Sequence, residues 1–253
     1  MSLVKKIRKE VKAAVILIAA ITGISLVQKR QSDTICSRVH INIINPDGSN
    51  FVTENEISKL VSADQSVPLT GNPFRRIQLK EVENRVETNG YIEEAEAYKD
   101  HRGDIYLDAY IATPLARVLR PGKPDLYITE KGNLIETSPR YTARVLVISG
   151  DYVNHFTMNL KKDTLTHALF DFLTFVSHND FWKAQIVQIS MNKDGEMILY
   201  PQVTRQYVQF GTIDDWERKM AKLKIFYDRI LPFKGWNSYT RVNLKYDNQI
   251  ICE

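Results

Sequence analysis

Histidines, cysteines and paired carboxylates are the residues of this sequence that could hold a metal ion or transfer protons. Five histidines are dispersed along the chain: His40, His101, His155, His167 and His178. The two cysteines, Cys36 and Cys252, add no metal-ligand spacing to them. Asp214–Asp215 fits a helix start, where acids complement the helix dipole, and Glu93–Glu94 fits a polar strand. These residues therefore predict no metal site and no acid–base pair.

Signatures of catalysis and nucleotide binding are absent from the sequence as well. We find no Gly-x-Ser-x-Gly elbow, no phosphate-binding loop, no His-Glu-x-x-His motif and no dinucleotide fingerprint. We therefore predict no catalytic residue, no metal-binding residue, no cofactor-binding residue and no cofactor. The protein is expected not to be an enzyme, so its function must lie in binding.

The charge of the chain is concentrated at its N-terminal end. The 253 residues have a net charge of +4, but residues 1–30 hold 7 of the 34 basic residues and one of the 30 acidic ones. The remainder has 27 basic and 29 acidic residues, a net charge of −2. A region so close to neutrality has no electrostatic footprint for nucleic acid, so we expect no nucleic-acid partner.

The longest uninterrupted apolar run is Ala13 to Val27, which predicts a membrane anchor. As a helix it is about 22 Å long, and flanking side chains and local thinning of the bilayer complete the span. No small-x-small cleavage site follows it, and Lys29 and Arg30 are typical of a stop-transfer signal. Five basic residues precede the run, so the positive-inside rule places the N-terminus in the cytoplasm. We predict a cytoplasmic tail (1–12), a single-pass transmembrane helix (13–28) and an external remainder.

The first external segment predicts strand, helix, helix, strand, strand. Alternating apolar residues indicate a strand over 39–43, and Thr53 with Glu56 forms a capping box that starts a helix. A second helix is predicted over 77–89. Two strands, over 92–99 and 104–112, complete the segment.

The second external segment predicts mostly strands with two longer helices. Strands are expected over 141–148, 184–191, 196–200 and 203–210, and helices over 164–176 and 213–231. Asn192-Lys193-Asp194-Gly195 is a hairpin turn, and Pro232 is expected to end the second helix. One long strand, 239–252, closes the chain. Cys36 and Cys252 would form a disulfide only if the two ends of this external part meet.

The order of elements resembles two known families. Residues 37–118, with the exit Ile111 to Val118, resemble a polypeptide-transport-associated (POTRA) domain. The hairpin Asp125 to Ile135, the helix Lys222 to Tyr227 and the strand Val242 to Asp247 are similar to bacterial cell-division proteins of the FtsQ/DivIB family. The segment Asn248 to Cys252 departs from the small residues of many relatives. The predicted fold class is α+β: the anchor, a POTRA-like domain (37–118), and a mainly antiparallel β domain with flanking helices (119–253).

The resemblance implies a non-enzymatic scaffold of the division machinery at the septum of the cytoplasmic (inner) membrane. An edge strand exposes unpaired backbone groups to which another chain can add a strand. The resemblance implies that the closing strand recruits the small bitopic proteins FtsB (DivIC) and FtsL. The expected partner-binding residues are Tyr239, Arg241, Asn243, Lys245, Tyr246, Asn248, Gln249 and Ile250.

Two other functions stay open from the sequence. One is an outer-membrane assembly protein, which would usually repeat the first domain or lead into a barrel; neither pattern is present in the sequence. The other is a membrane-tethered periplasmic enzyme with an unrecognised site. Depletion separates the two classes, because loss of a division scaffold gives filamentous cells and loss of a hydrolase changes wall fragments.

Overall fold

The computed structural model describes residues 16–22, 33–62, 68–164 and 166–253. By its contacts the chain forms two compact units. The small unit contains the described residues up to Ile44 together with Val52–Ile111. The large unit contains Asn45–Phe51 and Ala112–Glu253.

Only part of the predicted anchor can be compared with the structure. Residues 16–22 are helical and their side chains are exposed. The predicted tail (1–12) and the remaining positions of the predicted span (13–28) lie outside the described residues. None of the described helices has the length and apolar content needed to cross a bilayer.

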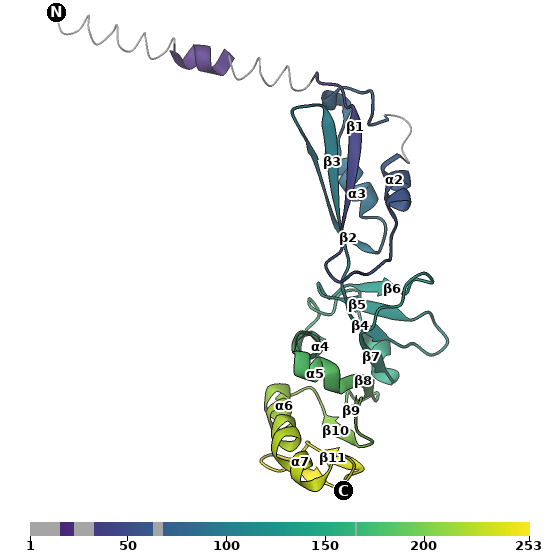
Figure 1. The fold of residues 1–253 in the computed structure, drawn as a ribbon, viewed down its shortest axis with the longest axis vertical. Coiled ribbons are helices and arrows are strands. Elements are labelled where there is room, and N and C mark those ends of the chain that lie inside the picture. Colours follow the sequence, from purple (N-terminus) through teal and green to yellow (C-terminus); the bar gives the residue numbers. More distant parts are fainter. Residues whose placement is uncertain (1–15, 23–32, 63–67, 165) are drawn as a thin grey trace, which may run out of the picture. The chain divides into compact units, whose positions relative to one another are not determined.

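The small unit is a three-stranded sheet with helices on one face (Figure 1). Its elements are β1 (Arg38–Ile44), α2 (Glu54–Ser62), a 3-10 turn (Phe74–Arg76), α3 (Leu79–Val86), β2 (Ile92–Lys99) and β3 (Asp104–Ile111). The strand order is β1-β3-β2, with β1 parallel and β2 antiparallel to β3. Ile105 and Leu107 of the central strand are fully buried, as are Ile57 of α2 and Val86 of α3. The predicted order of elements is confirmed.

The start of α2 confirms the predicted capping box. The Thr53 backbone N–H donates to Glu56 Oε2 at 2.9 Å, and the Glu56 N–H donates to Thr53 Oγ1 at 3.4 Å. The two residues therefore satisfy each other's backbone donors at the point where the helix has no internal acceptors.

The large unit is one nine-stranded sheet in the order β12-β11-β10-β9-β8-β7-β4-β5-β6. The strands are β4 (Pro114–Val118), β5 (Leu126–Thr129), β6 (Leu134–Glu136), β7 (Leu146–Ser149), β8 (Ile186–Met191), β9 (Met197–Pro201), β10 (Tyr207–Gly211), β11 (Arg241–Asn243) and β12 (Ile251–Cys252). The pairs β4–β7, β7–β8 and β10–β11 are parallel and the others antiparallel.

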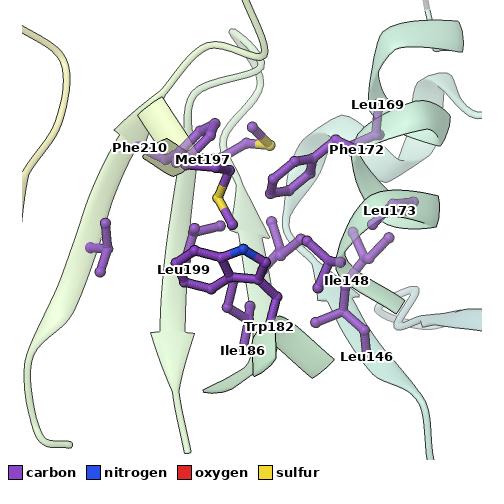
Figure 2. Close-up of a cluster of buried hydrophobic side chains, with 14 of the residues drawn as sticks. Leu146, Ile148, Leu169, Phe172, Leu173, Trp182, Ile186, Met197, Leu199 and Phe210 are labelled. Carbon is purple, nitrogen blue, oxygen red and sulfur yellow. The ribbon is translucent and has the colours of Figure 1, made fainter. Parts of the chain in front are cut away.

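Helices pack on this sheet and bury an aromatic and aliphatic core. They are a 3-10 turn (Asp151–His155), α4 (His167–His178), α5 (Asp180–Gln185), α6 (Trp216–Ile225), a π-helix (Phe226–Ile230) and α7 (Leu231–Lys234). Figure 2 shows Phe172 of α4 beside Met197 and Phe210 of the strands. The Phe172 and Phe210 ring centroids are 5.2 Å apart. The sheet and the helices are therefore one hydrophobic body, and its edge strands are held by the same core.

Two predicted boundaries in the middle of the chain differ from the structure. The small unit ends at Ile111, whereas the sequence placed the end of the first domain at Val118. The reason is that β4 pairs with β5 and β7 in the large sheet. The strand predicted over 141–148 is also too long, because residues 141–145 are irregular and β7 begins at Leu146.

The prediction that Pro232 ends the second long helix is wrong. The helix begins at Trp216 and passes through π geometry at Phe226–Ile230, and then continues as α7 to Lys234 with Pro232 in its first turn. A proline in a helix lacks an N–H and clashes with the carbonyl four residues earlier. The wider π turn before Pro232 relieves that conflict, so the chain stays helical.

Candidate partner-binding edge

The long closing strand predicted over 239–252 is wrong, because the chain forms a short hairpin there. β11 and β12 pair antiparallel, with Val242 opposite Cys252 and Asn243 opposite Ile251. The connection turns back at Asn248, whose φ of +56° lies in the left-handed region that asparagine tolerates. The hairpin makes β12, and not β11, the outermost strand of the sheet.

The hydrogen-bond pattern shows which backbone groups of β12 face outward. The Arg241 N–H donates to the Glu253 carbonyl at 3.1 Å, and the Glu253 N–H donates to the Arg241 carbonyl at 3.0 Å. In an antiparallel ladder such pairs alternate with pairs that exchange no bond. Cys252 occupies the non-bonded position opposite Val242. Its N–H and C=O are therefore directed away from β11, toward the outer edge.

The predicted binding residues are divided between the hairpin strands and their loop. Arg241 and Asn243 lie in β11, and Tyr239 precedes it with its ring centroid 5.9 Å from that of Phe226. The rest lie in the loop before β12: Lys245, Tyr246, Asn248, Gln249 and Ile250. The structure thus brings all of them to one end of the sheet, but places none of them in the edge strand itself.

Contacts with α6 hold the loop in place. The Lys222 ammonium donates to the Leu244 carbonyl at 2.9 Å and to the Tyr246 carbonyl at 2.6 Å. Burial lowers the pKa of Lys222. Arg218 of α6 bonds Asp247 at 2.7 Å. The hairpin is therefore fastened to the helical layer at several points.

The two faces of the edge differ in polarity. The side chains of Ile250 and Cys252 pack against the main core and remain half-buried. Burial also raises the pKa of the Cys252 thiol, which keeps it protonated near neutral pH. On the other face Arg241 forms an ion pair with Glu253, and this contact raises the pKa of Arg241. An added strand therefore meets an apolar side and a charged side.

Residues 251–253 are the functional candidates that the sequence analysis missed. The polar run Asp247-Asn248-Gln249 was the available signal, because Asp and Asn favour turns and Asn accepts a positive φ. Reading that run as a turn predicts a hairpin and moves the edge to Ile251 and Cys252.

The opposite end of the same sheet is closed by a neighbouring segment. The outermost strand there is β6, and its Leu134 N–H donates to the Met158 carbonyl at 3.1 Å. Asn133 forms a further bridge with Asn159. No such cover is found for β12 among the residues that the structure describes. β12 is therefore the available edge of the large unit.

Other sites offer little chemistry. Among the described residues no group of three or more His, Cys, Asp or Glu side chains is arranged to hold a metal ion. A cavity of about 280 Å³ lies beside the hairpin, between Gly150, Glu196 and Lys245. Lys245 and Glu196 form an ion pair across it. Among the described features, the outer edge of β12 is the one whose backbone N–H and C=O groups are placed to pair with another strand.

Comparison with known families agrees with this division of the chain. A family model described as FtsQ/DivIB, C-terminal related, matches residues 113–253. A second model, described as a POTRA-like domain, matches residues 34–109. A search of curated proteins finds no match.

Proposed function

The chain belongs to the FtsQ/DivIB family, and from this membership we propose that it is a non-enzymatic, membrane-anchored scaffold of the bacterial division machinery. The family is generally non-catalytic, and a POTRA-like domain beside an FtsQ/DivIB domain is consistent with a division-related scaffold. The basic N-terminal tail and the apolar run support a single-pass anchor in the cytoplasmic membrane with the N-terminus inside. The bulk of the chain then works outside the cytoplasm, at the septum.

The open edge of β12 is the observation that carries the proposed mode of binding. A small bitopic division protein of the FtsB (DivIC) or FtsL kind adds one of its strands beside β12. The outward N–H and C=O of Cys252 supply main-chain hydrogen bonds, which give affinity without depending on the partner's side chains. Ile250 and Cys252 offer the apolar side against which alternate partner side chains pack. The added strand links cell-wall synthesis to the division ring.

The position of the edge decides which substitutions should affect partner binding. Tyr246 and Asn248 lie in the loop, so replacing them tests the shape of the hairpin and leaves the backbone groups of β12 in place. A proline at position 252 is a more direct test. It removes the outward N–H and leaves the bonds between Arg241 and Glu253 in place, because prolines are tolerated where a strand's N–H faces away from the sheet.

The experiment compares Cys252→Pro with Cys252→Ala for binding to the FtsB-like partner of the same bacterium. We expect Cys252→Pro to weaken binding by roughly tenfold or more, the cost of one lost main-chain bond and the steric conflict at the edge. Cys252→Ala keeps the N–H and should bind within about threefold of the natural chain. In cells, only the proline variant should fail to prevent filamentation when the natural protein is depleted.

Equal partner binding by the proline variant, the alanine variant and the natural chain would rule out strand addition at β12. A fluorescent fusion that never gathers at division sites would separately rule out the septal location.

A further inference from the structure

The small unit has a second surface that the proposed edge does not use. It is the face of the three-stranded sheet opposite α2 and α3, here named the ladder face. It is formed by Arg38, His40, Asn42 and Ile44 of β1, Asp104, Tyr106, Asp108 and Tyr110 of β3, and Glu94, Glu96 and Tyr98 of β2. Glu96 and Tyr98 are exposed, and Tyr106 is half-buried. Within the part of the small unit that the structure describes, both helices lie on the other face (Figure 1).

Three rings in register form the centre of the ladder face. His40, Tyr106 and Tyr98 occupy paired positions on β1, β3 and β2. The His40 and Tyr106 centroids are 4.8 Å apart with planes 19° apart, and those of Tyr106 and Tyr98 are 5.4 Å apart with planes 9° apart. Tyr98 is at the end of the row and 48% exposed, so the outer side of its ring is available to a ligand.

Three of the four carboxylates on this face differ in the charge of their hydrogen-bond partners. Asp104 is charge-compensated, because Arg38 lies 3.0 Å from it and His40 lies 3.2 Å from it. Asp108 instead accepts a hydrogen bond from the neutral Asn42 amide at 2.7 Å, and Glu96 accepts one from the Tyr110 hydroxyl at 3.3 Å. Neutral donors orient a carboxylate without cancelling its charge. The charge of Glu96 accordingly raises the pKa of Tyr110.

We propose that the ladder face binds a basic, arginine-containing extended segment of another protein. A guanidinium is planar, so it can stack on the Tyr98 ring and donate paired hydrogen bonds to a carboxylate. Asp108 and Glu96 face the same side of the sheet as Tyr98 and carry the negative charge that such a segment needs. The inference rests on the small unit alone and stands apart from strand addition at β12.

The test uses the full chain in detergent micelles and a fluorescent peptide of alternating arginine and serine. We expect saturable binding that weakens as salt is raised, since Glu96 is exposed and Asp108 is only partly buried. In Glu96→Gln with Asp108→Asn, the amide oxygens still accept the bonds from Tyr110 and Asn42, and only the charge is lost. This double variant should bind the peptide about tenfold more weakly.

A matched pair of substitutions controls for net charge. Glu54→Gln with Glu81→Gln removes two exposed carboxylates from the first turns of α2 and α3, away from the ladder face. Binding within about twofold of the natural chain is expected. Tyr98→Leu should weaken binding of the arginine peptide more than binding of a lysine–serine peptide, because the flat guanidinium gains more from the ring.

Three results would overturn the proposal. The first is that the natural chain fails to bind the peptide. The second is that the two double variants weaken binding equally. The third is that a peptide of residues 1–12 binds this face more tightly than the arginine–serine peptide. The last result would assign the face to the chain's own basic tail. Equal thermal unfolding of both double variants confirms that folding is not the cause of any difference.

Discussion

Tyr227 shows how a single side chain holds helical segments of the large unit together. It is 3% exposed and lies among aromatic rings, with centroid distances of 5.7 Å to Phe181 and 6.0 Å to Trp182. Burial raises the pKa of Tyr227 to about 12. The hydroxyl therefore stays neutral in the folded chain at a pH where an unfolded chain would ionise it.

This shift predicts a loss of stability at alkaline pH. The unfolded tyrosine ionises near pH 10 and the folded one near pH 12, so stability is fully present below pH 10 and declines as the pH rises toward 12. Between pH 9 and pH 11 the loss from this group is on the order of 1 kcal/mol. Urea unfolding of the natural chain and of Tyr227→Phe measures it. If both lose the same stability over this interval, the burial of Tyr227 does not have the stated effect.

Gly150 is a position where only glycine fits. Its φ is +102°, and a Cβ added there would lie 2.1 Å from the Met191 carbonyl oxygen at the junction of β7 and β8. Gly122 has φ +73° but no atom within 4 Å of the added Cβ. An alanine at Gly122 would therefore introduce backbone strain alone, whereas an alanine at Gly150 would introduce backbone strain and a steric clash.

We expect Gly150→Ala to destabilise the large unit by roughly 3 kcal/mol or more, and Gly122→Ala by about 1 kcal/mol. Thermal unfolding of the two variants tests the difference. Equal effects of the two substitutions would mean that the approach to Met191 is not tight in solution.

The sequence predicted residues that form local pairs and missed those set by tertiary context. The Thr53–Glu56 capping box follows from spacing alone and is confirmed. The turn at Asn192 is confirmed too, since its side chain accepts the N–H groups of Asp194 and Glu196 at 3.0 and 2.9 Å. Cys252 was missed as an edge residue, because its position depends on where the chain turns back in space.

At the scale of elements, the edge strands of the two sheets differ in whether side chains cover their outward backbone groups. The outer side of β2 in the small unit is closed by α3: Glu87 accepts the Ala95 N–H at 3.1 Å and Glu83 accepts the Ala97 N–H at 2.8 Å. Carboxylates that cap edge donors prevent another strand from pairing there. β12 of the large unit has no such carboxylate cap among the described residues, and this contrast supports the proposal that a partner strand adds there.

Removing both caps should open the β2 edge. In Glu83→Ala with Glu87→Ala, the amides of Ala95 and Ala97 lose charged acceptors, and we expect their hydrogen exchange to become roughly tenfold faster. Light scattering should also show self-association at high concentration. Unchanged exchange at both amides would show that the carboxylates do not close the edge.

The capping box makes a separate prediction about α2. Thr53→Ala removes the side-chain acceptor for the Glu56 N–H and should cost about 1 kcal/mol of stability. Ser58→Ala, at an exposed position within the helix, is the control and should be neutral or slightly stabilising. Urea unfolding of each variant, monitored by hydrogen exchange of the α2 amides, measures the stability of the small unit and distinguishes Thr53→Ala from Ser58→Ala. An equal response would mean that the cap contributes nothing.

Elements were predictable where periodicity is local and unpredictable where packing decides. The strand predicted from alternation over 104–112 is confirmed as β3, which ends one residue earlier, at Ile111. The helix that passes Pro232 could not be predicted, because its π turn is stabilised by Phe226 and Tyr227 in the core. The closing hairpin was read as a strand, because Val242 and Leu244 continue an alternation that the turn at Asn248 interrupts.

At the scale of the whole molecule, the two proposed binding surfaces lie on different units. The FtsQ/DivIB match covers the large unit with its open edge, and the POTRA-like match covers the small unit with its ladder face. Family membership was predictable because the order of elements survives errors of a few residues in each boundary. The edge strand was not, because a two-residue strand such as β12 leaves no periodic pattern in the sequence.

Amide hydrogen exchange of β12, measured with and without the FtsB-like partner, tests the central claim most directly. Strand addition predicts that the Cys252 N–H exchanges freely in the isolated chain and roughly tenfold or more slowly in the complex, while the Leu134 N–H of β6 is unchanged. A complex that forms with no change in exchange at Cys252 would contradict the account.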